Sequence, residues 1–130
     1  MATVNLTNED FMAAVEKPGI LLIDWWASWC APCKAFAPTY ERVSAKNPDV
    51  VFAKVDVDAQ QELAGEFQIR SIPTLMVFRD GVPLMAQPGM LPEAALEEVI
   101  KQVRALDMQD VLKKISEQKQ KVDEGARRTA

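Results

Sequence analysis

Apolar residues along the chain follow two spacings in turn, one typical of strands and one typical of helices. Residues 20–27 form a near-continuous apolar run, as expected of a strand covered on both faces. Residues 50–57 alternate, which predicts a second buried strand. The pattern predicts strands at 3–6, 20–27, 50–57, 74–78 and 82–87, and helices from Thr7 or Asn8 to Glu16 and at 32–46, 60–67 and 92–106.

The order of these elements indicates an α/β fold. Crossovers of the βαβ kind favour parallel strands, and Asp80-Gly81 between two strands is a strong hairpin signal that adds antiparallel ones. We therefore expect a central mixed β-sheet flanked by helices. Pro38 lies inside the predicted 32–46 helix and predicts a kink there.

The end of the chain has a different composition. Residues 1–106 carry 9 basic and 14 acidic groups, whereas residues 107–130 carry 6 basic and 5 acidic groups and are rich in Lys and Gln. The tail predicts a C-terminal helical extension, with disorder from Gly125 to Ala130. Its apolar residues near helical spacing are Met108, Val111, Leu112, Ile115 and Val122.

Several roles for residues 107–130 stay open at this point. The helix could fold back on the domain and bury Val111, Leu112 and Ile115, join its neighbour into a dimer, or reach a partner. It could also be a solvated extension without a role. The sequence predicts one domain at residues 1–106 followed by this extension, and a monomer unless the tail pairs.

Length, charge and hydropathy narrow the functional classes. A chain of 130 residues has the size of one domain, and a net charge of −4 argues against nucleic acid as a partner. Apolar runs stay short of the ~18 residues that a membrane helix needs. The N-terminus lacks the basic and apolar regions of a signal peptide, which predicts a cytoplasmic protein if the chain is the full gene product.

The chain contains no histidine and two cysteines, Cys30 and Cys33. The absence of imidazole removes Ser-His and Cys-His dyads and the common zinc sites, and two thiolates fall short of the four ligands that zinc prefers. A disulfide across so small a loop adds little stability. We therefore expect no bound metal or cofactor, and a cysteine pair that is present for its chemistry.

The segment Trp29-Cys30-Ala31-Pro32-Cys33-Lys34 lies at a predicted strand-to-helix junction. A helix that begins near Cys30 presents unpaired N–H groups and a positive dipole end, which favour the thiolate. Cys33 lies one turn further on, within disulfide reach, and Pro32 suits a first helical turn. Cys30 would attack a substrate disulfide and Cys33 would resolve the mixed disulfide. A zinc site shared between chains and two inert buried cysteines are the alternatives.

Two further features point to the same site. Asp24 interrupts a doubly covered strand, where burial raises the pKa of a carboxyl, so it could exchange a proton with Cys33 or face solvent at the strand end. Lys54, one strand over, could be its partner. Ile72-Pro73 opens a strand, and its bond could be cis, although base rates of ~5–6% favour trans.

Taken together, these segments resemble the thioredoxin family over residues 3–106, in its bacterial form. The resemblance rests on Asp24-Trp25-Trp26-Ala27-Ser28-Trp29-Cys30-Ala31-Pro32-Cys33-Lys34, Lys54-Val55-Asp56-Val57-Asp58, Ile69-Arg70-Ser71-Ile72-Pro73-Thr74-Leu75, Asp80-Gly81 and Gly89. It implies the thioredoxin fold and a protein disulfide reductase in cell redox homeostasis. The family also implies oxidised protein substrates and a thioredoxin reductase, with electrons usually from NADPH.

The resemblance assigns residues position by position. Cys30 and Cys33 would form the redox disulfide, Asp24 would be the buried acid with Lys54 as its neighbour, and Pro73 would be a cis-proline facing the disulfide. The substrate-binding rim would comprise Trp29, Ala31, Pro32, Ile72, Pro73, Gly89 and Met90.

Four departures from the family pattern affect these expectations. Ala31 stands where most thioredoxins have Gly, and Trp25 replaces the commoner Phe. Gln87-Pro88 before Gly89 alters a loop near the substrate-binding rim, and residues follow Leu106, where typical thioredoxins stop. Two rival hypotheses follow. A strongly stabilised Cys30 thiolate would make the protein an oxidant or isomerase, and a use of the fold for docking alone would make it a binding module.

Overall fold

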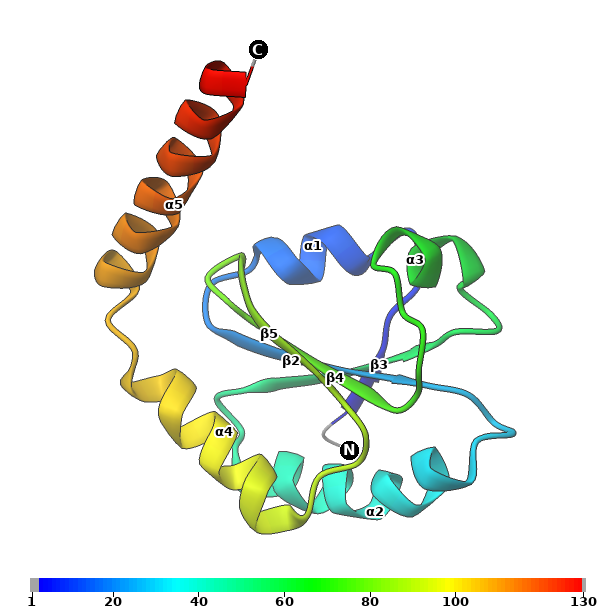
Figure 1. The fold of residues 1–130 in the computed structure, drawn as a ribbon. Helices are drawn as coiled ribbons and strands as arrows, with labels where there is room; N and C mark the ends of the chain where they lie inside the picture. The colour runs from blue at the N-terminus through cyan, green and yellow to red at the C-terminus, as the bar shows by residue number, and fades with distance from the viewer. Residues whose placement is uncertain (1–2, 130) are drawn as a thin grey trace.

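The computed structural model describes residues 3–129, which form a five-stranded sheet with helices on both faces and a C-terminal helix beyond them (Figure 1). The strands are β1 (Thr3–Asn5), β2 (Ile20–Trp26), β3 (Val51–Asp56), β4 (Thr74–Arg79) and β5 (Val82–Pro88). The helices are α1 (Phe11–Glu16), α2 (Ala31–Lys46), α3 (Gln61–Glu66), α4 (Glu93–Ala105) and α5 (Met108–Thr129).

The sheet is mixed, as the sequence predicts, and its strand order is β1-β3-β2-β4-β5. Strands β1 and β2 both run parallel to β3, while β4 runs antiparallel to β2 and β5 antiparallel to β4. The chain turns between β4 and β5 at Asp80-Gly81, where both residues have positive φ. Strand β2 is thus the central strand, and the cysteine-bearing segment directly follows its carboxyl end.

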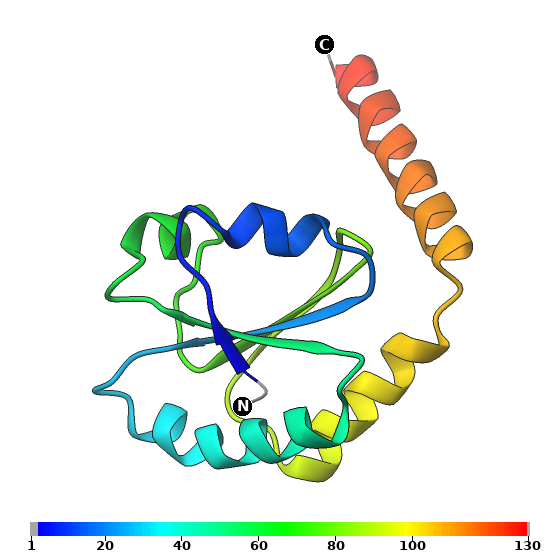
Figure 2. The same cartoon turned by 180° about the vertical axis from the view of Figure 1, so that it is seen from behind.

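Two apolar layers enclose the sheet. Helices α2 and α4 cover one face, and α1 and α3 cover the other (Figures 1 and 2). Side chains of β2 pack alternately into the two layers. Leu22 packs under α2 and α4, and Ile23 and Trp25 pack under α1 and α3. Asp24 follows Leu22 by two residues, so its side chain points to the same face of the sheet, and it is buried there under α2.

Some element limits differ from the sequence prediction. Helix α1 begins at Phe11 and not at residue 7 or 8, because the Asp10 carboxylate accepts the N–H of Thr7 at 2.6 Å and holds residues 7–10 in a turn. Helix α2 continues through Pro38 as one element. The predicted 60–67 helix is one residue shorter at each end.

Helix α5 stands apart from the body of the domain (Figures 1 and 2). Leu112 and Ile115 are 52% and 46% exposed, which contradicts a tail folded back on the domain. The helix also extends to Thr129, where the sequence predicted disorder from Gly125, since Ala126, Arg127 and Arg128 are good helix formers that outweigh one glycine. Ala130 lies outside the described residues. Within residues 3–129, no helix has the length and apolar character needed to cross a bilayer.

The start of α5 is nevertheless well defined. The Asp107 carboxylate accepts the N–H groups of Gln109 and Asp110 at 3.0 and 3.3 Å, as a helix cap does. Arg79 of β4 donates from Nη1 to the carbonyl oxygens of Val103 and Leu106, both at 2.8 Å. These bonds tie the end of α4 and the short connection to the sheet.

Candidate active site

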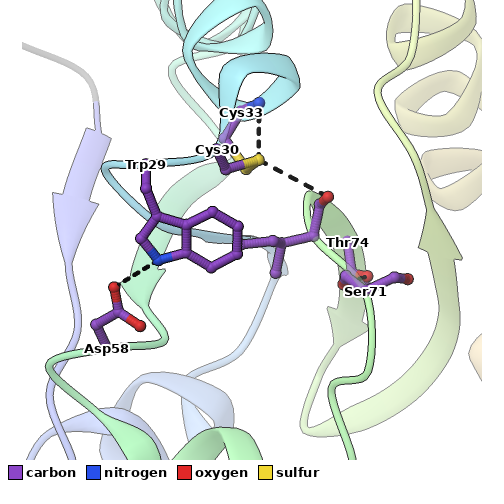
Figure 3. The surroundings of a disulfide bond; sticks show 7 residues. Trp29, Cys30, Cys33, Asp58, Ser71 and Thr74 are labelled. Atoms are coloured by element: carbon purple, nitrogen blue, oxygen red, sulfur yellow. Dashed lines mark hydrogen bonds between the residues drawn. A yellow bond between two sulfur atoms is a disulfide. The ribbon is translucent and has the colours of Figure 1, made fainter.

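Cys30 and Cys33 form a disulfide at the N-terminus of α2 (Figure 3). Cys30 is the N-cap residue, and the N–H of Cys33 donates to its sulfur at 3.2 Å. The two Cα atoms lie 5.3 Å apart, as the spacing of a helical turn predicts. Both cysteines are buried, while Ala31 and Pro32 between them are exposed. A helix start that donates an N–H to a sulfur favours negative charge there.

The loop before β4 closes the site on one side. The Cys30 sulfur lies 3.8 Å from the carbonyl oxygen of Ile72, a contact drawn as a dashed line in Figure 3. The Ile72-Pro73 peptide bond is cis, as the family resemblance implied. Ser71 and Thr74 brace the loop, since the Thr74 hydroxyl donates to the Ser71 carbonyl at 2.7 Å.

The loop after β5 joins the same region. The N–H of Gly89 donates to the carbonyl oxygen of Pro73 at 2.8 Å. Gly89 has a φ of 92°, a backbone conformation that a residue with a Cβ rarely adopts. Met90 follows it and is 45% exposed. The structure thus brings Gly89 next to Pro73, more than a dozen residues away in sequence.

Trp29 is the most exposed of the large apolar side chains near the disulfide, at 67%. Its indole N–H donates to Oδ2 of Asp58 at 2.8 Å (Figure 3). Beside it lies a hollow of about 400 Å³, lined by Trp29, Val57, Ile69, Arg70, Ser71 and Ile72. Sequence analysis assigned no role to Asp58, although Asp58 stands inside one of the segments that carry the family resemblance.

Asp24 lies in the interior of β2, 1% exposed, and among the described residues neither carboxylate oxygen has a hydrogen-bond partner. Burial raises its pKa from the usual 3.8 to about 7, and the positive charge of Lys54 lowers it in part. Asp24 lies on the face of β2 that α2 covers, the face of Leu22. Burial raises the pKa of Tyr40 in α2, and the nearby Asp24 charge raises it further. The expectation of a buried acid holds, and the solvent-facing alternative does not.

Lys54 is paired with Asp24 in the register of β2 and β3, yet it forms no ion pair with it. Its ammonium lies 4.6 Å from the centre of the Trp26 ring, within cation–π range. Lys54 therefore acts on Asp24 as a nearby charge, with Trp26 as its direct contact. The sequence did not single out Trp26, and its position two residues after Asp24, on the same face of β2, was the available signal.

The structure gathers the predicted residues into two layers. Trp29, Ala31, Pro32 and Met90 are exposed around the disulfide, and Asp24 and Lys54 lie in the sheet under α2. Within residues 3–129, no group of three or more Cys, Asp or Glu side chains is arranged to hold a metal ion.

Comparison with known proteins agrees with this geometry. The family model named Thioredoxin matches residues 2–102. The chain belongs to the thioredoxin family. It is 56% identical over 117 residues to the Streptomyces coelicolor protein named "Putative thioredoxin 2", covering 90% of this chain and 87% of that protein. It is 41% identical over 101 residues to the thioredoxin of Bacillus subtilis, covering 77% of this chain and 96% of the relative.

A solved structure of a mutant thioredoxin from Halobacterium salinarum has the same fold, with a TM-score of 0.74, 29% identity and coverage of 81% of this chain and 93% of that one. Family membership and the Cys30–Cys33 pair together make the protein a thiol–disulfide oxidoreductase of the protein-disulfide reductase type. The family has thioredoxin reductase and protein substrates as its partners.

Proposed function

We propose that Cys30 is the attacking thiolate of the reduced protein and Cys33 the resolving thiol. The observation that carries this assignment is the Cys33 N–H aimed at the Cys30 sulfur at the start of α2. In the first step the Cys30 thiolate attacks a substrate disulfide, one substrate sulfur bonds to Cys30, and the other leaves as a thiolate that takes up a proton.

In the second step the Cys33 thiolate attacks the Cys30 sulfur. The mixed disulfide breaks, the Cys30–Cys33 disulfide forms, and the substrate has gained two electrons and two protons. Cys33 must lose its proton for this attack. Asp24 is the base we assign, because its buried carboxyl under α2 has a pKa of about 7 and no hydrogen-bond partner among the described residues.

Lys54 is assigned as the group that keeps Asp24 from becoming too weak an acid. Burial alone would favour the protonated carboxyl, and the Lys54 charge opposes that effect. The Trp26 ring holds the ammonium 4.6 Å from its centre. The cation therefore acts on Asp24 without neutralising it in an ion pair.

The docking surface for protein substrates is the apolar rim around the disulfide. Exposed Trp29 and Met90, the cis Ile72-Pro73 loop and the hydrogen-bonded Gly89 loop support this assignment. The main chain beside Ile72 would pair with an extended substrate segment, as a strand does. The proposed rim comprises Trp29, Ala31, Pro32, Ile72, Pro73, Gly89 and Met90.

We further propose the cellular setting. A thioredoxin reductase that uses NADPH would return the Cys30–Cys33 disulfide to the dithiol, so that the protein carries electrons to oxidised proteins in the cytoplasm. Residues 1–106 would form the catalytic unit, supported by the match of the family model to residues 2–102. Residues 107–130 would act separately from it.

The two cysteine roles are tested by trapping. The Cys33→Ser variant, mixed with an oxidised protein substrate, should accumulate a covalent adduct at Cys30, because the first step proceeds and the second cannot. The Cys30→Ser variant is the matched control and should form almost no adduct. Mass spectrometry of the non-reduced mixture measures both, and an adduct that forms on Cys33 as readily as on Cys30 would reverse the assignment.

A further inference from the structure

The side chains of α5 are arranged in parallel rows that repeat every seven residues. Met108, Ile115 and Val122 form an apolar row, and Val111 and Leu112 widen it. At 3.6 residues per turn, positions seven apart lie almost on one line along a helix. Leu112, Ile115 and Val122 are 52%, 46% and 62% exposed, whereas Met108 and Val111 at the start of the helix are half-buried, so the exposed part of the row runs from Leu112 to Val122.

Basic residues border the apolar row. Lys114 and Lys121, again seven apart, lie along one side. On the other side Lys119 lies in line with Leu112, with Asp123 next to it. The acidic residues Asp110, Glu117 and Glu124 form a third row on the opposite face of the helix. Lys114 is 3.0 Å from Asp110, but both side chains are exposed, and such surface pairs contribute little. With three lysines and one aspartate, the border of the apolar row has a net positive charge towards whatever packs there.

A second α5 helix is a poor occupant of this row. In a parallel pair, Lys114 of one helix would face Lys119 of the other, and in an antiparallel pair Lys114 would face Lys121. Both arrangements place like charges in contact, which selects against self-pairing. Charge complementarity requires a partner whose own apolar stripe is bordered by Asp or Glu.

A bilayer surface is also a weaker match. Amphipathic helices that lie on membranes combine basic residues with aromatic anchors. The 22 residues of α5 contain no Trp, Tyr or Phe, and the helix carries an acidic row. Heptad spacing with basic borders is instead the pattern of a helix that pairs with another helix.

The position of α5 suits a docking role. Its first turn is capped by Asp107, and the chain before it is tied to β4 through Arg79. Figure 1 shows α5 leaving the domain on the side away from the start of α2, where the disulfide lies. A partner on α5 would leave Cys30 free to react.

We propose that α5 is a docking helix for a partner protein that presents a helix with an apolar stripe bordered by acidic residues. Docking would hold the reductase beside its partner and raise the effective concentration of the dithiol near disulfides there. The segment lies beyond residue 102, where the match to the family model ends. Because the 117 residues shared with the Streptomyces relative exceed the 106 that precede Asp107, that match includes at least eleven residues of the tail.

The test uses the full chain and two synthetic helical peptides of three heptads with identical apolar positions. One peptide has Glu at all positions that border the stripe, and the other has Lys. Fluorescence anisotropy should show that the Glu peptide binds at least about tenfold more tightly than the Lys peptide, and that added salt reduces the difference. Equal binding of the two peptides, or none by either, would overturn the proposal.

Variants locate the contact. Ile115→Gln should lower the affinity for the Glu peptide at least about tenfold. The double change Lys114→Glu with Lys121→Glu should make the protein bind the Lys peptide more tightly than the Glu peptide. Lys113→Glu is the control, because it makes the same charge change per site on the far face of α5 and should leave the preference intact. All four substituted positions are exposed, so the fold and the reductase activity should persist.

Two further measurements test whether a second copy of the chain or a membrane binds the apolar row of α5 instead. Sedimentation equilibrium of the full chain should show a monomer, and a dimer that Ile115→Gln abolishes would identify a second copy as the occupant and overturn the proposal. Co-sedimentation with phosphatidylglycerol vesicles should show no binding that depends on Ile115. Such binding would assign the helix to a membrane instead.

Discussion

Helices α2 and α5 have apolar residues at the same kind of spacing and opposite surroundings. In α2, Phe36, Tyr40 and Val43 are buried against the sheet and α4. In α5, Ile115 and Val122 repeat at helical spacing and remain exposed. Periodicity therefore predicts which face of a helix is apolar, and the place of the helix in the fold decides whether that face becomes core or surface.

Their first turns differ in a parallel way. Both helices begin with a side chain that accepts backbone N–H groups, the Cys30 sulfur in α2 and the Asp107 carboxylate in α5. The Cys30 sulfur is buried beside the Ile72 carbonyl and bonded to a second cysteine. Asp107 is exposed and only caps. The same backbone arrangement supports chemistry in one case and helix formation in the other.

The Cys30→Ser change separates these two uses and has the largest expected effect. Serine remains a good N-cap, so α2 should keep its start, but the nucleophilic sulfur is lost. We expect dithiothreitol-driven reduction of a protein disulfide to fall at least ~1000-fold towards the uncatalysed rate. Circular dichroism should show unchanged helix content, and wild-type turnover by the variant would contradict the assignment of Cys30.

Truncation of one apolar side chain in each helix tests the contrast in burial. Phe36→Ala should lower the free energy of unfolding by about 3–5 kcal/mol, because it leaves a cavity between α2 and the sheet. Ile115→Ala should change it by less than about 0.5 kcal/mol, since that side chain is 46% exposed on a helix that stands apart from the domain. Urea denaturation measures both, and similar losses would mean that α5 packs on the domain.

Asp24 beneath α2 has no counterpart beside α5, and it makes the stability of the domain depend on pH. Its pKa rises from 3.8 in the unfolded chain to about 7 in the fold, so its contribution is fully favourable below pH 3.8 and is lost as the pH rises to 7. The free energy of unfolding of Asp24→Asn, taken relative to that of wild type, should therefore rise by about 4 kcal/mol between pH 4 and pH 8.

Urea denaturation of both proteins at several pH values measures this gain. Asp49 and Glu93 carry pKa values lowered by their basic partners, but they are unchanged between the two proteins, so their effects cancel. A stability difference that does not vary with pH would show that Asp24 is ionised in the folded state throughout.

The smallest effect concerns the cap of α5. Asp107→Ala should remove the acceptor for the Gln109 and Asp110 N–H groups and destabilise the first turn of α5 by about 1 kcal/mol. Hydrogen exchange of these amides should accelerate about fivefold, while amides of β2 keep their rates. Asp123→Ala, in the same helix but away from its start, is the control.

The sequence predicted those parts of the molecule that depend on local pattern. The mixed sheet follows from the apolar runs and the Asp80-Gly81 hairpin, and the cysteine geometry follows from the spacing of one helical turn. The resemblance to a family added the cis Ile72-Pro73 bond, which composition disfavours.

Contacts between distant segments were beyond sequence reasoning. The Asp58 carboxylate that receives the Trp29 indole lies 29 residues from it. Lys54 could equally have paired with Asp24, and only the folded arrangement shows its ammonium over Trp26. The course of α5 was also open, because an amphipathic pattern is compatible with folding back or with projecting outward.

The buried carboxyl of Asp24 has a consequence for spectroscopy. Histidine is the side chain that ordinarily titrates between pH 5 and 8, and this chain has none. In the oxidised protein the cysteines do not titrate, and Asp24, with a pKa of about 7, is the side chain expected to titrate in that pH range. An infrared titration near pH 7 should therefore follow the carbonyl stretch of one protonated carboxyl with little overlap from other side chains, so that the protein carries its own reporter of protonation in the sheet under α2.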